Sequence, residues 1–165
     1  MTSAAELANM LESDRACAPY FRGCYNRLDM IISPIIDLNE KNIFVYLVNQ
    51  HFCALIIHPE QSYYIDPLGQ PPPADLMPTV QRWAMPYRHV PNRRVQSEHS
   101  QLCAIYVYYF CQFLCRQQSS QEQLPFTKDL RQNEILLLQW YRQHWPRRQQ
   151  QQQQDGDRRW RRQAD

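Results

Sequence analysis

With 165 residues, the chain has the length of one domain and can bury a real hydrophobic core. Hydrophobic residues make up 44% and aromatic residues 12%, which favours a globular protein, and the net charge is only +2. No run of about 18 apolar residues occurs, so we expect no membrane span, no targeting signal and no membrane partner.

The N-terminal segment predicts an amphipathic helix and not a signal peptide. Ser3 and Glu6 have the spacing of a capping box, and Leu7, Met10 and Leu11 follow on one helical face. Residues 17–34 contain two prolines and a glycine and are interpreted as a loop. Residues 42–49 are rich in β-branched and aromatic types and predict a strand.

The segment HFCALIIHPEQSYYIDPLG, residues 51–69, predicts an antiparallel hairpin. A loop centred between His58 and Pro59 would place His51 opposite Asp66, with Cβ atoms about 5 Å apart. With residues 42–49, the hairpin would form a three-stranded antiparallel unit. Histidine and aspartate are also common at strand ends and turns without any function, so the hairpin alone leaves both interpretations open.

The rest of the chain alternates connectors with further elements. A proline-rich connector follows the hairpin, then a short helix at 76–83 and a strand at 87–95 that Pro91 interrupts. Residues 103–115 have strand-like composition, but their length favours a buried central helix. Residues 130–145 predict an amphipathic helix, with apolar residues Leu130, Ile135, Leu138, Tyr141 and Trp145. We expect a domain at 1–146 and a disordered, glutamine- and arginine-rich tail at 147–165.

Six cysteines occur, and none forms a CxxC pair. This pattern predicts a reduced, intracellular chain without zinc or another metal. Cys103 stands where the central helix would begin, and a helix N-terminus favours a thiolate. Gln96 lies seven residues earlier, on the loop leading into that helix, so its side-chain amide and the backbone N–H of Cys103 could form an oxyanion hole. Small apolar core positions are the expected role of the other cysteines, Cys17, Cys24, Cys53, Cys111 and Cys115.

The ordered set of these motifs resembles the adenain family, the adenovirus maturation proteases, and more distantly the deSUMOylating proteases of the same clan. The matching segments, in order, are CAPYFRGCYNRLDMIISP, QHFCAL, IDPLG, VQSEHSQLCAIY and RQNEILLLQWYRQHWP. The resemblance covers roughly residues 5–146. It implies that His51 is the base, Asp66 its orienting carboxylate, Cys103 the nucleophile and Gln96 the oxyanion donor.

The fold expected from these observations is α+β, with an antiparallel sheet packed on a central helix that carries Cys103, and with flanking helices. The resemblance implies a cysteine endopeptidase that cleaves viral capsid or core precursors during virion maturation, in the host nucleus and the virion. We expect a monomer. The alternatives are an isopeptidase acting on ubiquitin-like modifiers and a degenerate, capsid-associated binding protein. His99, close to Cys103 in sequence, is a rival base, whereas His58, His89 and His144 are expected to be solvated.

The sequence departs from the family pattern at several positions. Ala104 replaces the usual glycine after the nucleophile, Phe52 replaces a tryptophan, and the region between Asp66 and Gln96 is shorter. Residues 71–95 hold no cysteine, so activation through a disulfide-linked peptide is not expected, whereas a non-covalent peptide or DNA activator stays open. The chemistry itself requires no cofactor.

The tail combines arginine side chains with one aromatic residue, Trp160. Arginines beside an aromatic ring can bind nucleic-acid phosphates and stack on bases, and the resemblance implies DNA as a cofactor. A solvated tail without a ligand is the alternative, because aspartates are interspersed. The arginines are Arg147, Arg148, Arg158, Arg159, Arg161 and Arg162.

Overall fold

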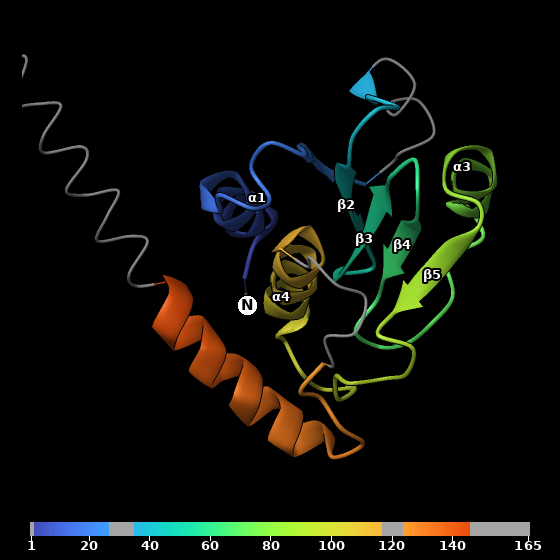
Figure 1. The fold of residues 1–165 in the computed structure, drawn as a ribbon. Helices are drawn as coiled ribbons and strands as arrows, with labels where there is room; N and C mark the ends of the chain where they lie inside the picture. The colour runs from blue at the N-terminus through green and yellow to red at the C-terminus, as the bar shows by residue number, and fades with distance from the viewer. Residues whose placement is uncertain (1, 27–34, 117–123, 146–165) are drawn as a thin grey trace, which may run out of the picture.

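The structure, a computed structural model, describes residues 2–26, 35–116 and 124–145 (Figure 1). In chain order its elements are α1 (Ala4–Ser13), β1 (Phe21–Tyr25), β2 (Asn42–Val48), β3 (His51–Ile57), β4 (Ser62–Ile65), α3 (Met77–Trp83), β5 (Tyr87–Val90) and α4 (Cys103–Arg116). Residues 130–145 are also helical. The predicted tail at 147–165 lies outside the described residues.

The five strands form one mixed sheet in the order β1-β2-β3-β4-β5. The expected antiparallel unit is confirmed at its centre, where β3 pairs with β2 and β4. The expectation of a wholly antiparallel sheet was wrong, because β1 pairs with β2 and β4 with β5 in parallel. Long connections precede β2 and β5. Parallel pairing requires them, because each new strand must begin at the same end of the sheet as the strand before it.

Strand β1 lies in the segment interpreted as a loop, and that interpretation was wrong for residues 21–25. The pairing of β1 with β2 is irregular between Phe21 and Cys24, and Gly23 adopts φ +117° there. A glycine at such an irregularity is typical of a β-bulge, which removes the alternation by which strands are found in sequences. Residues 27–34 of the same segment lie outside the described part of the chain.

The predicted helices have specific local causes. The Ser3 side chain caps α1 by accepting a hydrogen bond from the backbone N–H of Glu6 at 3.1 Å. The residues at 103–115 form a helix, α4, whose side chains are buried on nearly all sides, as expected for a central helix. In the helix at 130–145, Leu137 and Trp145 are buried, whereas Ile135, which the apolar pattern placed inside, is 46% exposed.

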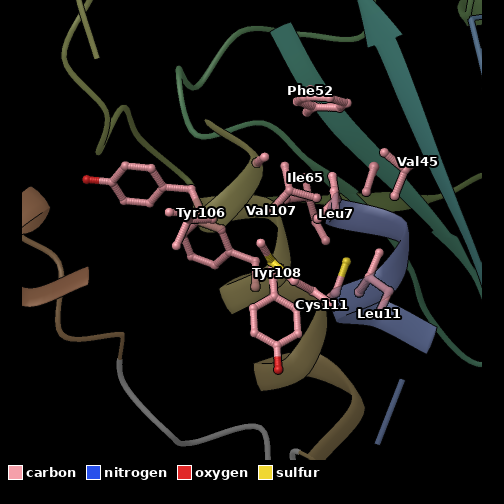
Figure 2. Packing of buried hydrophobic residues seen from close by; sticks show 14 of the residues in the cluster. Leu7, Leu11, Val45, Phe52, Ile65, Tyr106, Val107, Tyr108 and Cys111 are labelled. Carbon is pink, nitrogen blue, oxygen red and sulfur yellow. The ribbon is translucent and has the colours of Figure 1, made fainter. Parts of the chain in front are cut away.

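Two hydrophobic clusters cover the two faces of the sheet. Figure 1 shows α1 and α4 on one face and α3 on the other. Alternate residues of β3 divide between them: Phe52, Ala54 and Ile56 face α4, while Cys53 and Leu55 face α3. Figure 2 shows the α4 side, where Tyr106, Val107, Tyr108 and Cys111 pack with Leu7 and Leu11 of α1 and with Val45, Phe52 and Ile65 of the strands. Burial of each such side chain contributes about 1.5–3 kcal/mol, so α4 is fixed firmly on the sheet.

Candidate active site

His51 is the first residue of β3 and follows a two-residue turn. Asn49 and Gln50 adopt φ angles of +48° and +62° between the paired residues Val48 and His51. Positive φ at both central residues is the mark of a type I′ turn, whose twist matches that of the strands it joins. The turn therefore fixes where the imidazole emerges from the sheet.

Asp66 directly follows β4, and its carboxylate contacts His51. Atoms His51 Nε2 and Asp66 Oδ1 lie 2.7 Å apart, as the predicted proximity requires. The predicted register was wrong by two residues, since Ala54 pairs with Ile65, which places Asp66 opposite Cys53. A shift of two residues keeps every side chain on its face of the sheet, so the two residues meet as diagonal neighbours.

Asp66 is held by its own turn. It is 3% exposed, and its Oδ1 also accepts the backbone N–H of Leu68 at 2.9 Å. The backbone N–H of Asp66 donates to the carbonyl of Val90 on β5, and the N–H of Gly69 donates to the carbonyl of Asp66. A buried carboxylate with such fixed partners can hold the imidazole in one orientation.

Cys103 begins α4 and lies against His51. The His51 imidazole is close enough to the Cys103 thiol to lower its pKa, and Asp66 contacts the imidazole through Nε2. Burial favours the neutral thiol, but the His51 hydrogen bond and the backbone N–H groups of Phe52 and Ala104 outweigh it, so the pKa of Cys103 is lowered. Burial also disfavours the imidazolium, yet Asp66 and Cys103 raise the pKa of His51 to about 9. Both shifts favour a thiolate paired with an imidazolium.

Comparison with models of known protein families and with curated proteins finds no match.

Gln96, the fourth predicted residue, is 2% exposed on the loop before α4. Its Nε2 donates to the carbonyl of Ser100 at 3.0 Å, while its Oε1 has no hydrogen-bond partner within the described residues. The Ser100 carbonyl fixes the orientation of the amide, because a flipped amide would set two acceptor oxygens against each other. One N–H of Nε2 is thereby left for another acceptor.

The remaining candidates lie away from this group. The rival base His99 is exposed. Cys111 is fully buried, as expected of a core thiol, but Cys115 is only half-buried and has a lowered pKa, chiefly because Cys17 hydrogen-bonds to it. No His, Cys, Asp or Glu cluster suited to a metal ion occurs in the part of the chain that the structure describes, nor is any helix there long and apolar enough to cross a membrane.

A cavity of about 170 Å³ lies at the other end of β3, lined by residues that include His58, Trp83 and Met85. It is separated from His51 by the length of the strand, so it is not the space in which a substrate would meet Cys103. The backbone N–H of Phe52, which lowers the pKa of the Cys103 thiol, could not be predicted from the sequence, because a backbone group carries no signal of its own there.

Proposed function

We propose that the chain is a cysteine endopeptidase of the adenain type. The observation that carries this proposal is the contact of the Cys103 thiol with the His51 imidazole, which lowers the pKa of the thiol and raises that of the imidazole. Asp66 holds the imidazole, since its Oδ1 lies 2.7 Å from His51 Nε2. Displaced pKa values in a nucleophile and an adjacent base, at the start of a helix, are typical of an activated thiol.

The reaction would be acyl transfer in two steps. The Cys103 thiolate attacks the peptide carbonyl carbon, the C–N bond breaks, and the proton on His51 passes to the leaving amine. Water then attacks the thioester and gives a proton to His51, the C–S bond breaks, and the carboxylic acid leaves. The free N–H of Gln96 and the backbone N–H of Cys103 would stabilise the oxyanion in both steps, and each such donor is worth about 3–4 kcal/mol in known examples.

Viral capsid or core precursors as substrates, virion maturation in the host nucleus, and DNA binding through the tail are proposed from the sequence resemblance alone. The isopeptidase alternative uses the same four residues, and modifier conjugates as substrates separate it from the endopeptidase. Ala104 favours the non-catalytic alternative, because its side chain narrows the space for a substrate backbone beside Cys103.

The first test is thiol labelling. We expect iodoacetamide at pH 6, with and without DNA, to label Cys103 selectively among the six thiols, as mapped by mass spectrometry, because a thiolate reacts where a thiol does not. Labelling of Cys103 should disappear in His51→Ala. Cys115 also has a lowered pKa, so Cys115→Ser is the matched control and should leave the Cys103 signal unchanged.

Equal labelling of several cysteines, or Cys103 labelling that persists in His51→Ala, would remove the proposed ion pair. The non-catalytic alternative would then be favoured.

A further inference from the structure

The peptide unit between Val95 and Gln96 is held by the segment that carries Asp66. The backbone N–H groups of Val95 and Gln96 both donate to the carbonyl of Pro67, at 2.9 and 3.1 Å. Pro67 directly follows Asp66, so these hydrogen bonds join the loop that carries Gln96 to the end of β4, where Asp66 lies. The hydroxyl of Tyr106, three residues after Cys103, donates to the carbonyl of Val95 at 3.3 Å. The segments that carry Asp66, Gln96 and Cys103 therefore meet at one peptide unit.

Asn133 contacts this peptide unit from outside those three segments. It lies on the helix at 130–145, is fully buried, and donates from Nδ2 to the carbonyl of Val95 at 3.1 Å. The Asn133 amide also pairs with both backbone groups of Thr127: Nδ2 donates to the carbonyl and Oδ1 accepts the N–H, each at 2.7 Å. This double pairing fixes the amide, so its second N–H has one direction, toward Val95.

Two further hydrogen bonds join the loop around Gln96 to residues 126–134. The Ser97 hydroxyl donates to Glu134 Oε1 at 2.8 Å, and Arg93 Nη2 donates to the carbonyl of Phe126 at 3.0 Å. The loop is thus held on both sides of Gln96 by residues 126–134, and Asn133 is the most buried of these contacts. A loop fixed in this way can present a side-chain donor without reorganising during the reaction.

We infer that Asn133 is a positioning residue for Gln96: its hydrogen bond to the Val95 carbonyl sets the peptide plane from which the Gln96 side chain reaches the oxyanion. The inference rests on the proposed function, since it assigns to Asn133 a role in the same site. Asn133 touches neither the nucleophile nor the base, so its loss should impair only steps in which an oxyanion forms.

The experiment compares two reactions of Cys103 in Asn133→Ala. The first is acetylation by p-nitrophenyl acetate, in which the thiolate adds to the ester carbonyl, an oxyanion forms, and p-nitrophenolate leaves. The second is alkylation by iodoacetamide, in which the thiolate displaces iodide and no oxyanion forms. We expect acetylation to slow about 10-fold in Asn133→Ala, and about 100-fold in Gln96→Ala, with alkylation unchanged in both.

Asn42 provides a matched control. It is also a fully buried asparagine whose amide bonds to backbone groups, of Asp37 and Glu40, but it lies at the opposite end of the sheet from His51. Asn42→Ala should lose comparable stability and keep both rates. In the Gln96→Ala/Asn133→Ala double variant, acetylation should be no slower than in Gln96→Ala alone, because Asn133 acts through Gln96. If Asn133→Ala does not fold, Asn133→Ser removes the same bond and keeps a polar group.

Unchanged acetylation in Asn133→Ala, equal slowing of both reactions, or additive loss in the double variant would each overturn the role of Asn133. Absence of selective Cys103 alkylation in the wild type would instead overturn the proposed function, so the two failures are distinguishable.

Discussion

At the scale of single residues, the protonation of the site depends on Asp66. Burial alone would lower the pKa of His51. Contacts with Asp66 and Cys103 raise it to about 9, and the hydrogen bond to Asp66 has the largest effect among them. A raised pKa means that the imidazole keeps its proton up to about pH 9 and loses it above that pH. The lowered pKa of Cys103 means that its thiolate persists below the ordinary thiol value of 9.0. The ion pair therefore occupies the pH range between these two pKa values.

Asp66→Asn should narrow this range from both ends. We expect the pKa of His51 to fall by at least about one unit, and the pH midpoint of Cys103 alkylation to rise, because a neutral imidazole no longer stabilises the thiolate. Histidine NMR titration and the iodoacetamide rate as a function of pH measure the two effects. Asp75→Asn is the control, because it removes a carboxylate that accepts a hydrogen bond from Tyr46 on the α3 face of the sheet. Unaltered midpoints in Asp66→Asn would contradict the dependence on Asp66.

At the scale of elements, the turn before His51 carries a residue that fits it poorly. Gln50 has φ +62°, and a side chain costs about 1–2 kcal/mol in that region, whereas glycine adopts it readily. We expect Gln50→Gly to raise the free energy of unfolding by about 1 kcal/mol, because Asn-Gly is the favoured sequence of a type I′ turn. Urea denaturation measures the change. Gln50→Ala should bring no gain, and a loss of stability in Gln50→Gly would show that the Gln50 side chain makes a contact that outweighs the turn.

Elements with local signals could be predicted from the sequence, and those defined by distant partners could not. The Ser3 cap, the strand at 42–48 and the length of α4 were readable from neighbouring residues. The direction of β1 and β5 was not, because it depends on where long connections return the chain. The His51–Asp66 contact survived a wrong register only because the error was an even number of residues. An error of one residue would have turned the two side chains to opposite faces.

At the scale of the whole molecule, the site depends on the packing of segments that lie far apart in the sequence. Order along the chain was enough to predict a site of His51, Asp66, Gln96 and Cys103, and the structure brings the first two and Cys103 together. Asn133 and the Pro67 carbonyl carried no such signal. A buried asparagine in a helix cannot be distinguished in the sequence from an exposed one. The role of both groups comes from the contact between the segments that carry Asp66, Gln96 and Cys103, which only the folded chain reveals.

Gly69 is a position where two backbone segments approach each other closely, and it provides the last prediction. Gly69 adopts φ +70°, and a Cβ there would lie 2.7 Å from the backbone nitrogen of Arg94. Backbone cannot move aside as a flexible side chain can, so Gly69→Ala should push the turn after Asp66 away from the loop before Gln96. We expect a loss of about 2 kcal/mol in unfolding free energy and slower acetylation of Cys103 in the folded protein.

Gly23→Ala separates the two effects. Gly23 also has a positive φ, +117°, but its added Cβ would meet the Tyr25 ring on the edge strand β1. That variant should therefore lose stability and keep the acetylation rate of its folded fraction. Should Gly69→Ala keep its rate as well, the close approach at Gly69 would matter for folding alone, and the alignment of Asp66 with Gln96 would rest on the hydrogen bonds to Pro67.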